Sequence, residues 1–263
     1  MFDETLPTSF TVGCIAAVCT YLLCYVASNL LAKRFVPSAT KETLSYVPSL
    51  LHALAQTIAC WQPVTSSPQH WNNRVTYFDD ALYATDNSTG LGPAFWSGIF
   101  VGYLLADLVV ESRRCNWLMV AHHIFASVAW THTVSTHSLQ WYQCFLQFNE
   151  LSTIFLSLRK ILIGIFGFHK SSPSILMVNF LTFVTFAAVR VLPLPMVLYH
   201  YWMTDMKVLH SHAGATSFYL IWGMLTFHTV MQTYWFGLMI KLLLSICRGA
   251  QRKEASIEKR KRN

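Results

Sequence analysis

The chain has 263 residues and a formal net charge of +7, and its composition excludes an ordinary soluble domain. Hydrophobic residues make up 54% and charged residues only 12%, whereas soluble domains carry about a quarter charged residues. The basic residues lie in short clusters beside apolar runs, which argues against nucleic acid as a partner, because such binding needs a basic face. The seven cysteines form no CxxC pair, so we predict no metal site.

Seven apolar stretches are about as long as a membrane helix, which needs about 20 mostly apolar residues. They predict an all-α polytopic membrane protein with seven transmembrane helices. The first stretch follows Asp3 and Glu4 and not a basic region, so it should remain as an anchor and not be cleaved as a signal peptide. The predicted spans are 9–32, 43–61, 93–111, 116–137, 139–158, 174–200 and 214–246.

The distribution of charge predicts the orientation of these spans. With the N-terminus on the luminal side, fifteen of the nineteen Lys and Arg residues fall in cytosolic segments, as the positive-inside rule requires. Residues 1–8 are then luminal, and residues 249–263 form a basic cytosolic tail. The luminal loop before the third span contains the sequon Asn87-Ser88-Thr89, which predicts a glycoprotein modified at Asn87.

The last residues of the chain match a retrieval signal. Lys259 and Lys261 stand fifth and third from the C-terminus, as in the KxKxx pattern that coat machinery reads. This pattern predicts residence in the endoplasmic reticulum membrane. The plain alternative is a solvated basic end that only holds the last helix in orientation.

Ionisable residues inside the spans are energetically unfavourable there and are therefore candidates for function. A rise of about 1.5 Å per residue places five polar residues about 9–13 Å from the cytosolic boundary, on four different spans. Their shared depth predicts a common interior site. These residues are His52, His122, His123, Glu150 and Gln232.

Adjacent residues on a helix point about 100° apart, so His122 and His123 do not present two nitrogens to one ion. One of them should face a cavity while the other bonds a neighbouring helix or backbone. We expect Glu150 to find a partner in His123 or His52. Such a pair could serve as a general base for a lipid hydroxyl or amine. The alternative is a buried pair that fixes helix register.

Two further groups of polar residues have two readings each. Arg190 precedes Pro193, where the helix should kink, and it either anchors a lipid head group or bonds the kinked backbone and an acidic neighbour. On the last span, His228, Gln232 and Trp235 line one face, either as core packing or as ligand contacts. Asp107 lies near Glu111, Arg113 and Arg114, which favours an interfacial ion pair.

Four segments, taken in order, resemble the TLC-domain family, which includes the ceramide synthases. The resemblance covers about residues 40–248 and implies one domain, a six-helix TLC-type barrel made by spans two to seven, with an interior lipid cavity. The segments are His-His-Ile-Phe-Ala at 122–126, Asn-Glu-Leu-Ser-Thr at 149–153, Arg-Val-Leu-Pro at 190–193 and Gln-Thr-Tyr-Trp-Phe at 232–236.

The second segment departs from the ceramide synthases. These enzymes carry His-Asp one helix after the His-His pair, and a second Asp three positions later. Here Asn149 and Glu150 stand in place of His-Asp, and Thr153 in place of the second Asp. The segment is similar to that of the smaller TLC domain-containing and ceroid-lipofuscinosis-type proteins, which are linked to membrane lipid composition, ceramide metabolism or cargo transport.

The sequence therefore predicts a lipid-handling protein with membrane lipids as partners. As an enzyme it would be an acyltransferase in sphingolipid or phospholipid metabolism, with no bound cofactor and acyl-CoA as co-substrate. The alternative is a non-catalytic lipid-sensing regulator or a cargo receptor that cycles through the KxKxx tail. The predicted catalytic residues are His122, His123 and Glu150, and the predicted substrate-binding residues are His52, Asn149, Arg190, His228, Gln232 and Trp235.

Overall fold

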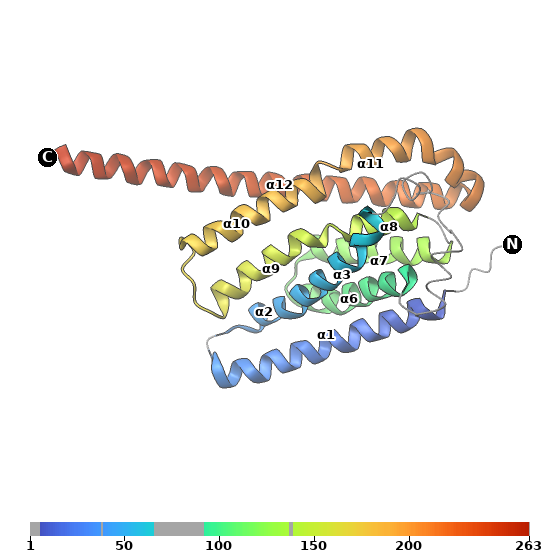
Figure 1. Ribbon diagram of the computed structural model, residues 1–263, viewed down its shortest axis with the longest axis horizontal. Helices are drawn as coiled ribbons and strands as arrows, with labels where there is room; N and C mark the ends of the chain where they lie inside the picture. Colours follow the sequence, from blue (N-terminus) through green and yellow to red (C-terminus); the bar gives the residue numbers. More distant parts are fainter. Residues whose placement is uncertain (1–5, 38, 66–91, 137–138, 263) are drawn as a thin grey trace.

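The structure is a computed structural model that describes residues 6–37, 39–65, 92–136 and 139–262. All regular elements within these ranges are helical, as the sequence predicts. Most of the helices run lengthwise, with α1 on one side and α10, α11 and α12 on the other (Figure 1). Between these sides α1 packs on α6, α6 on α7, α3 on α9, and α9 on α10. Asn87 lies outside the described residues.

The first part of the chain forms α1 (Thr8–Phe35), α2 (Lys41–Leu44), α3 (Tyr46–Thr65), α6 (Pro93–Arg113) and α7 (Trp117–Ser135). The second part forms α8 (Gln140–Gln147), α9 (Glu150–Gly164), α10 (Pro173–Phe186), the π-helical turn η1 (Ala187–Val191), α11 (Leu194–His200), a second π-helical turn η2 (Tyr201–Asp205) and α12 (Met206–Arg262).

Three helical stretches among the described residues are long and apolar enough to cross a membrane. They are Thr8–Phe35, Ala94–Arg113 and Pro173–Met203, which coincide with the first, third and sixth predicted spans. The other predicted spans are also mainly helical, but length and composition do not by themselves single them out as membrane crossings.

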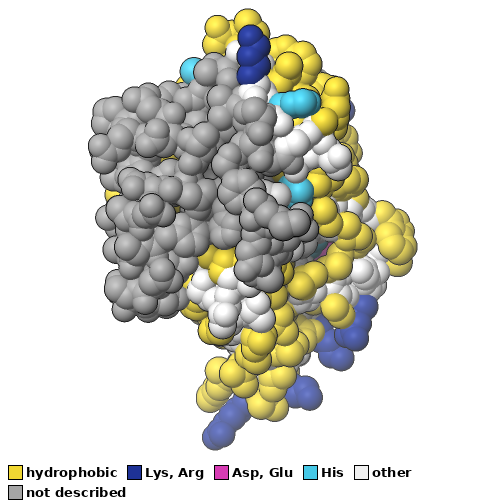
Figure 2. Space-filling view, turned by 90° about the vertical axis from the view of Figure 1, so that its right-hand side faces the viewer, with side chains coloured by type: hydrophobic (Ala, Val, Ile, Leu, Met, Phe, Trp, Pro, Cys, Tyr) yellow, Lys and Arg dark blue, Asp and Glu magenta, His cyan; other side chains and the backbone are white. Residues whose placement is uncertain are grey.

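The helices turn apolar side chains outward and polar ones inward. Leu23, Ile58 and Leu192 are 70%, 73% and 72% exposed, whereas His52, Gln56 and many other polar side chains are buried. Figure 2, which views the end where α1 begins, shows hydrophobic side chains over much of the described surface. Such large exposed apolar areas are unusual for a soluble monomer, so this surface indicates a membrane protein.

The predicted span 139–158 is not one continuous helix. It divides into α8 and α9, and the break falls at Phe148 and Asn149. The backbone carbonyl of Asn149 accepts hydrogen bonds from Ser152 and from the Arg190 side chain, so a distant residue stabilises the break. Carbonyls freed at a helix end need such partners when they are buried.

The last helix is longer than the predicted span 214–246. α12 contains one non-helical residue, Gly214, whose φ of 83° lies in the left-handed region that favours glycine. Beyond this kink it remains helical to Arg262 and projects away from the other helices (Figure 1). Lys259 and Lys261 therefore belong to the final turns of an extended helix.

Basic residues from several predicted cytosolic segments gather at one end of the structure. The Arg114 guanidinium donates to the Glu42 carbonyl at 3.0 Å and to the Ser45 hydroxyl at 2.6 Å. The Lys160 ammonium lies 5.5 Å from the centre of the Tyr46 ring. The starts of α2 and α3 and the ends of α6 and α9 therefore meet at this end.

Helices α1 and α6 pack closely because glycines line their crossing. Gly98 and Gly102 form a GxxxG pair on α6, and Gly13 faces them from α1. A Cβ added at Gly98 would lie 2.1 Å from the Phe10 carbonyl oxygen, and one added at Gly13 would lie 2.3 Å from the Phe95 carbonyl oxygen. Small residues at such spacing allow two membrane helices to approach backbone to backbone.

Replacing Gly98 with alanine should therefore destabilise the protein. The added methyl group would meet backbone and not a flexible side chain, so α1 must move away, and overpacking of this kind costs about 1–3 kcal/mol. Thermal unfolding in detergent should show a lower midpoint for Gly98→Ala. Gly237→Ala is the matched control, since a Cβ there meets nothing within 4 Å. Equal midpoints for both variants would contradict this account of the crossing.

Candidate functional site

The two adjacent histidines of α7 face different neighbours, as helical geometry requires. The His122 ring lies 6.0 Å from the His228 ring and 5.6 Å from the Trp235 ring, centre to centre, both on α12. The buried His123 points toward α6, where its Nε2 is 3.7 Å from Oδ2 of Asp107. The histidine pair thus takes part in two separate groups of residues on two sides of α7.

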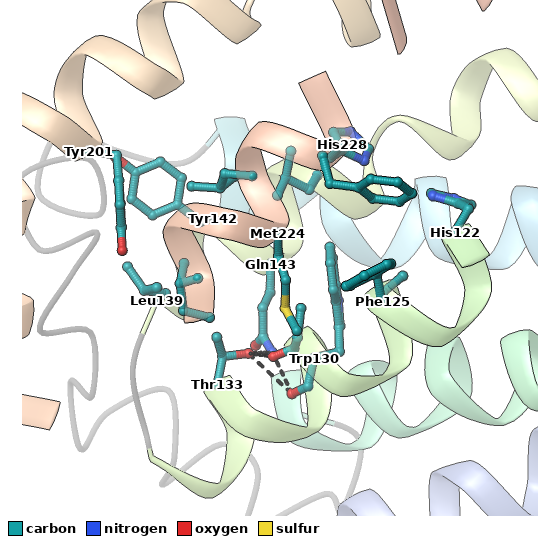
Figure 3. Close-up of a pocket in the computed structure, with 16 residues that line it drawn as sticks. His122, Phe125, Trp130, Thr133, Leu139, Tyr142, Gln143, Tyr201, Met224 and His228 are labelled. Atoms are coloured by element: carbon teal, nitrogen blue, oxygen red, sulfur yellow. Dashed lines mark hydrogen bonds between the residues drawn. The ribbon is translucent and has the colours of Figure 1, made fainter. Parts of the chain in front are cut away.

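His122 and His228 line a mainly apolar pocket between α7, α8 and α12. The two imidazoles lie at one end of this pocket and Tyr142 and Tyr201 at the other (Figure 3). The wall between these ends is mainly aliphatic and aromatic. Its members include Phe125, Ala126, Ala129, Trp130, Leu139, Leu146, Ile221, Met224, Leu225 and Phe227.

The polar groups in the pocket wall are largely occupied by the protein itself. The Gln143 amide donates to the Trp130 carbonyl at 3.1 Å and to the Thr133 hydroxyl, as the dashed lines of Figure 3 show. The Gln143 carbonyl oxygen accepts from the Ser97 hydroxyl at 3.5 Å. The pocket also contains the imidazoles of His122 and His228. An imidazole nitrogen can accept and release a proton, so these two rings are the candidates for acid–base chemistry in the pocket.

Behind this pair, Arg190 holds α9 and α12 together from its place on η1. Its Nε donates to the Asn149 carbonyl at 3.1 Å and to the Ser152 hydroxyl at 2.7 Å. Its Nη2 donates to the Thr153 hydroxyl at 2.8 Å, and its Nη1 lies 3.5 Å from Oε1 of Gln232. π-Helical turns often occur at functional sites, and this one carries the central residue of a buried polar network.

Glu150 is the acidic neighbour of Arg190. Its Oε1 lies 3.6 Å from Nη2 of Arg190, so the predicted pairing of Glu150 with His123 or His52 is wrong. Of the two interpretations of Arg190, the structure shows the bonded one, although the bonded backbone carbonyl is that of Asn149, just before α9, and not one of its own kinked helix.

The network reaches the pocket through one side chain. Nδ2 of Asn149 lies 3.5 Å from Nε2 of His228, at the limit of a hydrogen bond. Asn149 is itself held through its carbonyl by Arg190. The order Arg190, Asn149, His228 and His122 therefore links the buried ion pair to the pocket.

The residues of the predicted common layer make contacts in several groups. Gln232 and Glu150 join the Arg190 network, whereas His52 stacks on Tyr103, with ring centres 3.7 Å apart and an interplanar angle of 10°. His52 thus lies on the α3–α6 side, away from the residues lining the pocket. One common site for all five residues therefore stays a prediction.

The predicted interfacial ion pair does not include Asp107. Arg114 does pair with Glu111, at 2.5 Å, but Asp107 lies one turn deeper and is buried. Its Oδ1 accepts a 2.9 Å hydrogen bond from the Tyr21 hydroxyl, and its Oδ2 faces His123. The available signal was its position four residues before Glu111, which puts it one helical turn further from the basic end.

Among the residues that the structure describes, no group of three potential ligands is arranged to hold a metal ion.

Comparison with known proteins gives one match. The family model described as the TLC domain matches residues 45–241, a range that includes the pocket, the Arg190 network and His123. No match was found among curated proteins or among solved structures. The match covers most of the chain and leaves α1 outside it. The chain therefore belongs to the TLC-domain family.

Proposed function

We propose that this membrane protein is an acyltransferase that holds a lipid chain in the pocket between α7, α8 and α12 and reacts it beside His122. The observation that carries this proposal is a mainly apolar pocket with two imidazoles at one end. Ligand pockets commonly combine apolar walls with a few placed polar groups. An acyl chain suits the walls, and its ester, thioester or amide end suits the imidazoles.

The reaction we propose is transfer of an acyl group from acyl-CoA to a lipid hydroxyl or amine. His122 takes the proton of the acceptor while the acceptor oxygen or nitrogen forms a bond to the thioester carbonyl carbon. The carbon–sulfur bond then breaks, and the CoA thiolate leaves with the proton that His122 returns. No cofactor enters this scheme besides the co-substrate.

The polar network supports this chemistry by fixing the imidazole pair. His228 is 3.5 Å from Asn149, and Asn149 is held by Arg190. Rings held in this way need little reorganisation when charge develops during the reaction. Glu150 has a charge-balancing role in this scheme because it faces Arg190 and not the pocket.

The proposed setting is the endoplasmic reticulum membrane, crossed by seven spans with the N-terminus luminal and the C-terminus cytosolic. The gathering of basic residues around Arg114 and Lys160 supports a single cytosolic end. The end of α12 projects away from the other helices (Figure 1), which supports reading of the KxKxx tail by coat machinery. The six-helix barrel with an interior lipid cavity belongs to the same proposal.

Filling the pocket should remove bound lipid. Ala129 is a buried lining residue, so Ala129→Phe places a ring inside the pocket. Mass spectrometry of lipid that co-purifies with the protein should show at least a tenfold loss, because the chain and the new ring compete for one space. Val128→Phe is the matched control, since Val128 is the next residue on α7 and is 45% exposed.

Equal lipid content in the two variants would refute the pocket as the lipid site. A second outcome is that Ala129→Phe loses its lipid while the wild-type protein transfers no acyl group. This outcome would favour a second function, that of a non-catalytic lipid sensor. The observation behind this second function is that Glu150 pairs with Arg190 and not with a histidine, so no carboxylate is recorded beside the two pocket imidazoles.

A further inference from the structure

We propose that α1, the helix outside the matched TLC domain, supplies a positioning residue to the domain's interior. That residue is Tyr21, and it acts on His123 through Asp107. The three side chains come from three helices, α1, α6 and α7. The inference concerns the state of the His123 ring and goes beyond the acyl transfer proposed at His122.

The contacts place Asp107 between the other two residues. Tyr21 is 4% exposed, and its hydroxyl donates to Oδ1 of Asp107 at 2.9 Å. The other carboxylate oxygen, Oδ2, lies 3.7 Å from Nε2 of His123, which is within ion-pair range and beyond hydrogen-bond length. The hydroxyl therefore fixes the carboxylate in an orientation that turns its second oxygen toward the imidazole.

This orientation selects one tautomer of His123. A carboxylate next to Nε2 favours the form that carries the proton on Nε2, just as a carboxylate orients the histidine of a catalytic triad. Nδ1 then has a free lone pair. Nδ1 is buried and has no hydrogen-bond partner among the described residues, and an unpaired buried acceptor is destabilising. The lone pair thus suits a hydroxyl or amine donor from a ligand.

A second hollow borders Tyr21, although Asp107 and His123 are not part of its lining. It lies between α1, α3 and α6 and is lined by Tyr21, His52 and Tyr103 among mostly apolar residues. The Tyr21 and Tyr103 rings lie 5.9 Å apart, and His52 stacks on Tyr103. Without α1 this hollow would lose one wall and Asp107 would lose its hydrogen-bond donor.

The glycine crossing makes the position of Tyr21 precise. Gly13 and Gly98 bring the two backbones together two turns before Tyr21, so the hydroxyl reaches a carboxylate on the facing helix. Asp107 also lies in the same helix as Gly98 and Gly102. Close backbone approach and the hydrogen bond therefore belong to the same helix pair.

The test is nitrogen NMR of the full-length protein with 15N-labelled histidine in lipid bilayers, and His123→Gln identifies the His123 signals. The wild-type ring should show the tautomer protonated on Nε2. Tyr21→Phe should convert this signal to a mixture of both tautomers while the signals of His122 and His228 stay in place. Tyr25→Phe is the matched control, because Tyr25 lies one turn further along α1 and its carbonyl, not its hydroxyl, makes the recorded hydrogen bond.

An unchanged His123 signal in Tyr21→Phe would overturn the proposal, as would a wild-type ring protonated on Nδ1. If Tyr21→Phe does not yield folded protein, Asp107→Asn carries the same test, since its neutral amide should also give mixed tautomers. The measurement needs no substrate. Its failure would leave acyl transfer at His122 untouched, and absence of acyl transfer would leave this assignment untouched.

Discussion

Replacing Arg190 with methionine should abolish most of the folded protein. Arg190 is 8% exposed and bonds the Asn149 carbonyl, the hydroxyls of Ser152 and Thr153 and the Gln232 side chain. The substitution leaves these acceptors without their donor. It also leaves the Glu150 carboxylate without its cation, and breaking a buried ion pair costs about 3–5 kcal/mol. Size-exclusion chromatography in detergent measures the remaining monodisperse fraction.

Two further variants separate charge from geometry at this position. Arg190→Lys keeps the charge but loses the planar fork that serves α9 and α12 together, so its stability should fall between wild type and Arg190→Met. Arg190→Met combined with Glu150→Gln removes both charges and should recover part of the loss. If Arg190→Met melts at the wild-type temperature, the guanidinium does not hold these helices together.

The helices and their apolar faces follow from the sequence because they depend on local composition. The long apolar runs give α1, α6 and α10 directly, and the charges beside them mark one end of the structure. The break between α8 and α9 does not follow from local composition. It depends on Arg190, which is 41 residues further along the chain than Asn149. For the same reason, local composition does not predict that Glu150 pairs with Arg190.

The depth of a residue follows from counting, but its direction does not. Counting residues predicts one level for His52, His123 and Gln232, but the rotation of each helix decides which of these side chains meet. The rotation of α6 relative to α1 is set by backbone contacts at Gly13 and Gly98. In this arrangement Asp107 faces Tyr21 and His123. Sequence spacing contains no information on this rotation, so it assigns Asp107 to the membrane interface instead.

Replacing His122 with glutamine should reduce acyl transfer by about 10²–10⁴-fold, the usual contribution of a positioned general base. Glutamine has nearly the size of histidine, so the pocket should still bind lipid, but its amide does not accept and return a proton at neutral pH. Purified protein in bilayers, supplied with acyl-CoA and a mixture of lipid hydroxyl and amine acceptors, reports the reaction through mass spectrometry of acylated products.

Two other histidine variants show whether the loss of transfer is specific to His122. His228→Gln should reduce transfer less than His122→Gln, since we propose that His228 orients the first ring and is itself held by Asn149. His169→Gln is the control, because His169 is exposed between α9 and α10 and bonds only the nearby Ser171 in the recorded contacts. Full activity in His122→Gln would remove this residue from the chemistry. Equal losses in His122→Gln and His228→Gln would mean that the two neighbouring rings act as one unit.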